Sequence, residues 1–119
     1  MILRDITVEQ LKWADGNLTT TTNQSTQVVT AKGADYSVHV RITGTGTVSV
    51  TATVQASNTG GSNANEWFTV GSALSLTGTG GDSKGLQLTD NAYKYLRVTL
   101  TSITGTGATV VCYMGANTV

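Results

Sequence analysis

Proline is absent from this 119-residue sequence, and charged residues are scarce. Acidic and basic residues together make up 12% of the chain, roughly half the usual share, and they balance to a net charge of zero. This balance argues against the basic surface with which proteins bind nucleic acid or an anionic membrane. It also leaves little self-repulsion to keep copies of the protein apart.

Cysteine occurs once, at Cys112, which excludes an internal disulfide and a metal site built from several cysteines. The run Val110–Tyr113 predicts a strand buried on both faces, so we expect an inert core thiol. No segment approaches the ~20 apolar residues of a membrane span, and none has the pattern of a signal peptide. We therefore expect the protein to be made in a cytoplasm.

Threonine and glycine are abundant where charged residues are few, and their pattern indicates β-structure. From Tyr36 to Ala56, apolar residues alternate with serine, threonine and other polar residues, which is the period of a β-strand. Gly44-Thr45-Gly46 separates two alternating runs, so the stretch predicts an antiparallel hairpin with one apolar and one polar face.

Further alternating runs follow, and Ile103 breaks the phase of one of them, which predicts a bulge or a turn there. The sequence predicts an all-β fold of about seven or eight strands, an antiparallel β-sandwich or jelly roll. We expect polar and glycine-rich loops at 57–65, where a mobile tip is predicted, and at 78–85, with later strands at 66–70, 73–77, 86–88, 93–101 and 109–114.

A short motif occurs three times, at 42–46, 76–80 and 103–107, each an apolar residue followed by Thr-Gly-Thr-Gly. Duplication of an ancestral hairpin is one explanation. The favoured interpretation is a strand-end and turn solution used three times, because glycine adopts positive φ without steric cost.

Residues 1–35 differ from the rest, and 1–27 are interpreted as an N-terminal arm or peripheral segment, with the sandwich at 28–119. Within the arm, Asp5–Ala14 has the capping pattern of a short helix. The alternative is an extended arm whose Ile6, Leu11 and Trp13 anchor on a neighbouring surface.

No constellation in the sequence points to catalysis. His39 is the sole histidine and lies on the polar face beside Arg41, without a nearby carboxylate, so a solvated or interface role is favoured. Asp82, Asp90 and Asn91 are a weak candidate for calcium, and turn residues bonding their own backbone are the better interpretation. We expect no catalytic residues, no metal and no cofactor.

Three segments carry a resemblance to a known class: Ala56–Asn58, Glu66–Gly71 and Tyr95–Gly107. Over residues 34–115 the chain resembles small β-sandwich structural proteins of tailed bacteriophages, most closely capsid decoration (cement) proteins. The resemblance implies a non-enzymatic virion protein, made in the host cytoplasm, that binds the outer capsid surface as a trimer and stabilises the shell through multivalent contacts.

The implied partner is the major capsid protein or another virion protein, with neither nucleic acid nor membrane. The candidate partner-binding residues are Ile6, Leu11, Trp13, His39 and Arg41. Two alternatives stay open: a tail, neck or fibre component of the virion, and a carbohydrate-binding module whose aromatic residues, such as Trp67 and Tyr93, hold a sugar. For those aromatic residues a place in the core is favoured.

Overall fold

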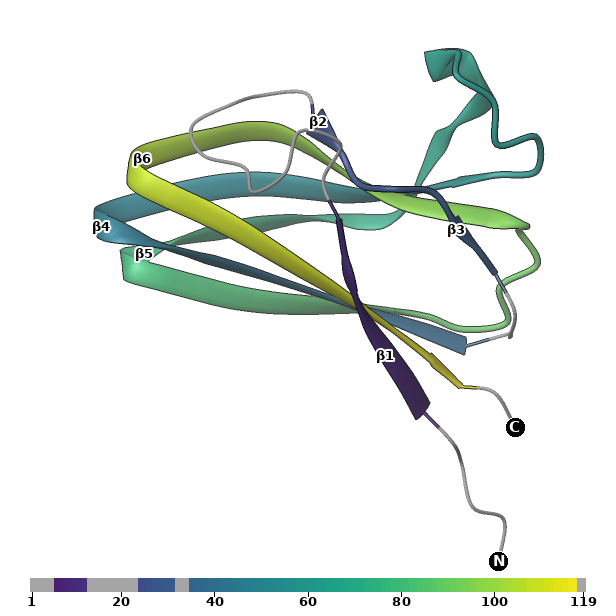
Figure 1. Ribbon diagram of the computed structural model, residues 1–119, viewed down its shortest axis with the longest axis horizontal. Coiled ribbons are helices and arrows are strands. Elements are labelled where there is room, and N and C mark those ends of the chain that lie inside the picture. The colour runs from purple at the N-terminus through teal and green to yellow at the C-terminus, as the bar shows by residue number, and fades with distance from the viewer. Residues whose placement is uncertain (1–5, 13–23, 32–34, 118–119) are drawn as a thin grey trace, which may run out of the picture.

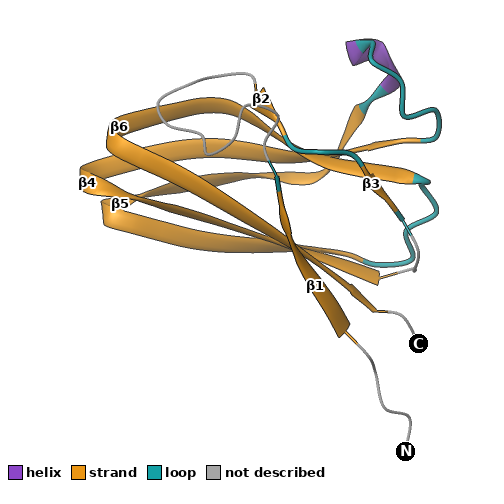
Figure 2. Cartoon of the chain, in the orientation of Figure 1, coloured by secondary structure: helices purple, strands orange, loops and turns teal. Residues whose placement is uncertain are grey.

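The computed structural model describes residues 6–12, 24–31 and 35–117, and nearly all of them are in strands (Figure 2). The all-β, antiparallel sandwich is thereby confirmed, and the described residues form six strands. Within these ranges no helix is long and apolar enough to cross a membrane. The elements are β1 (Ile6–Leu11), β2 (Gln24–Ser25), β3 (Val29–Thr30), β4 (Asp35–Ser57), the 3-10 turn η1 (Ala64–Glu66), β5 (Phe68–Leu88) and β6 (Tyr95–Asn117).

Three very long strands build both layers of the sandwich, because β4, β5 and β6 each bend back on themselves (Figure 1). In layer A, residues 35–43 of β4 pair with 81–88 of β5 and 109–117 of β6. In layer B, residues 47–57 of β4 pair with 68–79 of β5 and 95–104 of β6. The predicted hairpin within Tyr36–Ala56 is therefore wrong, since this stretch is a single bent strand.

The three Thr-Gly-Thr-Gly copies lie side by side at the bend. Thr47 pairs with Thr79 and Thr45 with Thr106, so the strands pass through a corner together, with shifts of register, where hairpin turns and a loop at 78–85 were predicted. Glycine is required there: Gly105 has φ +114°, and a Cβ on it would lie 2.8 Å from the carbonyl oxygen of Thr47. The repeated motif marks one shared corner of the sheet.

The core lies between the two layers and is built by the predicted alternation. Leu96, Val98 and Leu100 point inward, and the register slips by one residue before buried Ile103, which confirms the expected bulge. Cys112 is fully buried, and this burial raises the pKa of its thiol to about 12. The thiol is therefore protonated and shielded, as predicted.

The N-terminal segment is part of the sheet. Ile6–Leu11 pairs antiparallel with β6, so the helix predicted within Asp5–Ala14 is wrong over these residues. β2 also pairs with β6, and so does β3. The described parts of residues 1–27 thus lie along the side of β6, at the periphery of the two layers.

The two edges of the folded sheet differ. One long side of β6 is lined by β1 in layer A and by β2 and β3 in layer B. β5 pairs only with β4 among the described strands, so its other side is an open edge along both layers. At its bend the Asp82 carboxylate accepts hydrogen bonds from the backbone N–H groups of Thr77 (3.0 Å) and Ser83 (2.8 Å), which occupies two donors.

The loop between β4 and β5, predicted as a mobile tip, is tied by hydrogen bonds. The Glu66 carboxylate accepts from the hydroxyl of Thr59 and the backbone N–H of Asn63, both at 3.1 Å. The buried Ser57 hydroxyl accepts from the backbone N–H of Gly60 at 2.9 Å. The loop thereby has a defined conformation of its own.

Candidate functional site: the outer hollow of layer A

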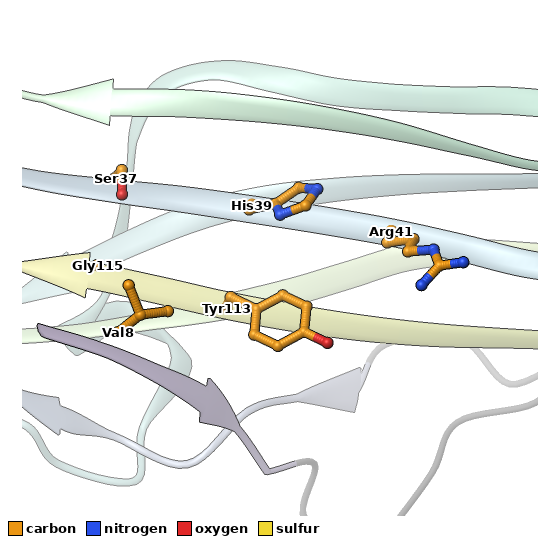
Figure 3. A pocket seen from close by; sticks show the side chains of 6 residues that line it. All are labelled: Val8, Ser37, His39, Arg41, Tyr113 and Gly115. Carbon is orange, nitrogen blue, oxygen red and sulfur yellow. The ribbon is translucent and has the colours of Figure 1, made fainter.

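A shallow, open hollow of about 500 Å³ lies on the outer face of layer A, over β1, β6 and β4 (Figure 3). Its position follows from the strand period, which turns alternate residues of each strand away from the core. Its lining, here called the outer hollow, consists of Val8, Ser37, His39, Arg41, Tyr113 and Gly115.

A glycine makes the hollow. Gly115 pairs with Val8 on one side and Ser37 on the other, and it has no side chain to fill the space between them. Two residues further along the strands, on the same face, Tyr113 pairs with His39. The result is a low floor beside two rings, with Arg41 beyond them (Figure 3).

The two rings of the hollow form one aromatic surface. The centroids of His39 and Tyr113 lie 5.7 Å apart with the planes tilted by 32°. His39 Nε2 is hydrogen-bonded to the Ser83 hydroxyl from β5, which fixes the imidazole on the sheet. Tyr113 is half-buried, and Figure 3 shows the face of its ring turned outward over the sheet.

Arg41 is the charged group of the outer hollow. Its side chain is exposed, and no described residue forms a hydrogen bond or an ion pair with its guanidinium. Among the described residues that line the hollow there is no carboxylate. A fixed positive charge without a counter-charge makes this surface suitable for an anionic group, and a guanidinium binds carboxylates in a two-pronged geometry.

The outer face of layer B is arranged differently. There the Arg97 guanidinium lies 4.2 Å from the centre of the Trp67 ring, and its Nε donates to Gln55 at 2.8 Å. Partial burial lowers the pKa of Arg97. Trp67 is only 6% exposed, and its indole N–H donates to the carbonyl oxygen of Gly61. These groups satisfy one another and leave little for a ligand.

Nothing in the described ranges resembles a metal site, since no three histidine, cysteine or acidic residues converge. The calcium candidates follow the turn interpretation instead. Asp82 binds the backbone of its own strand, and the side chain of Asn91 bonds the backbone N–H and C=O of Tyr93. Asp90 is a turn residue with φ +52°.

The predicted partner-binding residues are only partly brought together. His39 and Arg41 share the outer hollow. Leu11 is 2% exposed and belongs to the core of this chain, so the prediction that it lies on the surface is wrong. Ile6 lies at the start of β1, and Trp13 is outside the described residues.

Sequence reasoning missed Tyr113 and Val8. Tyr113 was assigned to a strand buried on both faces, whereas the alternation of Val110, Cys112 and Met114 places only those residues inside. The signal was therefore present, because Tyr113 and Gly115 fall in the opposite phase. Val8 had no such signal, since its position depends on the pairing of β1 with β6.

Comparison with protein-family models gives no match, and neither does comparison with curated protein sequences. Among solved structures, the chain is similar to the SPBc2 prophage-derived protein YomS, with 14% identity and a TM-score of 0.58 over 98% of this chain and 96% of that one. This similarity is one of fold.

Two further structures are more distant. One, titled "CBM4 structure and function", has 11% identity and a TM-score of 0.48 over 87% of this chain and 73% of that chain. The enzymatically active domain of bacteriophage CBA120 tailspike protein 4 has 8% identity and a TM-score of 0.43, over 94% of this chain and 19% of that chain. Neither carries an argument at this level of similarity.

Proposed function

We propose that the protein is a non-enzymatic structural component of a bacteriophage particle that binds the outer surface of the capsid. The observation that supports the proposal most is the correspondence of fold with a prophage-derived protein along nearly the full length of both chains. The resemblance of Tyr95–Gly107 and its neighbouring segments to decoration proteins points the same way.

The open edge of β5 supplies a surface for such contacts. From Phe68 to Gly81 the strand carries no charged residue and no proline, which are the usual means of protecting an edge. Added strands, from another copy or from the shell protein, bind such an edge through main-chain hydrogen bonds. A trimer would bring several copies of this edge to one particle and multiply the avidity of each contact.

The experiment is to locate the protein on particles produced from the genome that encodes it. Purified particles are analysed by mass spectrometry and labelled with an antibody against the chain, for electron microscopy. Label spread over the shell in many copies is the expected result. Label at a single vertex would assign the protein to the tail, neck or fibre, and absence from the particles would overturn the proposal.

The residues that contact the shell are best identified by point substitutions. Deleting the N-terminal residues 1–15 would be a less specific test, because it removes β1. That deletion exposes the side of β6 and takes Leu11 out of the core, so it unfolds or perturbs the protein whether or not the segment binds a shell. Ser75→Lys places a charge on the open edge of β5, where the side chain is exposed. We expect it to weaken particle binding, and Thr101→Lys, exposed on inner strand β6, to leave binding unchanged.

A further inference from the structure

We propose that the outer hollow of layer A binds a sugar that carries a carboxylate, such as a uronic acid unit of an acidic glycan. This goes beyond the proposed function, which concerns protein contacts on a particle, and it stands on the geometry of the hollow alone. The volume of about 500 Å³ falls within the range of small-ligand sites, roughly 300–1,000 Å³.

The charge of the hollow selects an acidic ligand. Arg41 projects from the outer face of β4 with no counter-charge among the described residues. Its planar guanidinium offers paired N–H donors that match a carboxylate. None of the described residues that line the hollow is a carboxylate, so none of them competes with the ligand for Arg41.

The ring of Tyr113 supplies the second contact. Its face is turned outward and is held in place beside His39 at 5.7 Å (Figure 3). The C–H face of a pyranose is apolar and flat, and it packs on an aromatic face while its edge hydroxyls bond polar groups. Ser37 lines the same hollow and offers its hydroxyl to that edge. Gly115, which has no side chain, leaves room for the sugar beside Tyr113.

The topology favours a sugar over an acidic peptide. The hollow lies over β6 and β4, which are inner strands of layer A with neighbours on both sides, and over β1, whose free backbone groups point sideways from the edge of the sheet. An extended peptide binds through free backbone groups at a sheet edge, and these strands have none to offer at this face. A sugar unit needs only a ring face, a charge and a few side-chain hydroxyls.

The test uses the full chain and titrates it by calorimetry with trigalacturonic acid, with its trimethyl ester and with tetraglutamate. The ester keeps the sugar and removes its charge. We expect saturable binding of the acid, and binding about tenfold or more weaker for the ester. Arg41→Gln should weaken binding of the acid to the same extent, whereas Lys84→Gln, an exposed cation outside the hollow, should leave it unchanged.

Tyr113→Leu tests the ring separately, because leucine keeps an apolar side chain and removes the flat face. We expect weaker binding of both acid and ester, with thermal melting showing that each variant is folded. The proposal is overturned if the acid does not bind at millimolar concentration, or if it binds Arg41→Gln as well as the parent. Arg41-dependent binding of tetraglutamate without binding of the sugar would also overturn it. None of these results bears on whether the protein is found on particles.

Discussion

Two arginines occupy comparable places in the two layers of the sandwich, and their surroundings are opposite. Arg41 and Arg97 both lie on the outer face of a long bent strand, in the run that precedes a Thr-Gly-Thr-Gly corner. Arg97 is stacked on Trp67 and bonded to Gln55, whereas Arg41 has no described partner. The difference teaches that layer B uses its arginine to stabilise a loop, and layer A leaves its arginine available to bind.

Among the substitutions that test this difference, we expect the largest loss of stability from removing the Trp67 ring, on which Arg97 stacks. Trp67→Ala removes a side chain that is 6% exposed and the hydrogen bond to the carbonyl of Gly61. We expect a loss of about 3–5 kcal/mol in the free energy of unfolding, measured by denaturant titration. A loss under about 1 kcal/mol would mean that the ring is not a structural support of the loop.

The comparison itself is tested by substituting each arginine with alanine. Arg97→Ala loses the cation–π contact and the bond to Gln55, so we expect a loss of about 1–2 kcal/mol. Arg41→Ala should lie within about 0.5 kcal/mol of the parent, as for an exposed side chain without partners. Denaturant titration of both variants decides the point, and equal losses would contradict the assignment of different roles.

A smaller and pH-dependent effect on thermal stability is expected from Asp82, at the bend of β5. Hydrogen bonds from the backbone N–H groups of Ser83 and Thr77 lower the pKa of Asp82 from its ordinary value of 3.8. A lowered pKa in the folded state means that the carboxylate stabilises the protein above the unfolded value and that this contribution is lost as pH falls through the folded one. Asp82→Asn should therefore lower Tm at pH 7 and have a vanishing effect toward pH 2.

Asp90→Asn is the matched control for Asp82, because Asp90 is an exposed aspartate whose carboxylate forms no hydrogen bond to a described residue. It should leave Tm unchanged at both pH values. If the two variants behave alike, the hydrogen bonds of Asp82 do not hold the corner.

The smallest effect is expected for the native Cys112 thiol. It lies in the core beneath layer A, opposite Val40, and burial raises its pKa to about 12. A thiol reagent at pH 8 should leave the folded protein unmodified and label it fully in denaturant. Labelling of the folded chain would show that layer A, which carries the outer hollow, opens locally. The same reagent cannot test layer B, because the chain has no other cysteine.

Particular residues show how far the sequence could be read. The inward phase of Leu96, Val98 and Leu100 and the bulge before Ile103 followed from a period of two, because that period is a property of the strand itself. The corner at Gly44–Gly46 did not follow. Glycine with positive φ suits a reversing turn and a bend equally, and the alternation keeps its phase through either.

The candidate site divides in the same way. The sequence placed His39 and Arg41 together on a polar face, since they are two residues apart in one strand. It could not bring Tyr113 beside His39, seventy-four positions later, because that contact depends on the register between β4 and β6. Nor could it place Leu11 in the core, since a short apolar pattern does not reveal which strand it pairs with.

The sequence by itself determined the strand character and the inner and outer faces of β4 and β6 and the burial of the thiol, because these depend on local alternation and hydrophobicity. Only the tertiary structure decided that three strands bend together at one corner, that the N-terminal strand pairs with β6, and that β5 pairs with β4 alone among the described strands. It also decided that Arg97 has partners, whereas Arg41 has none among the described residues. Pairing between distant segments sets each of these, and such pairing is a property of the whole chain that no local pattern encodes.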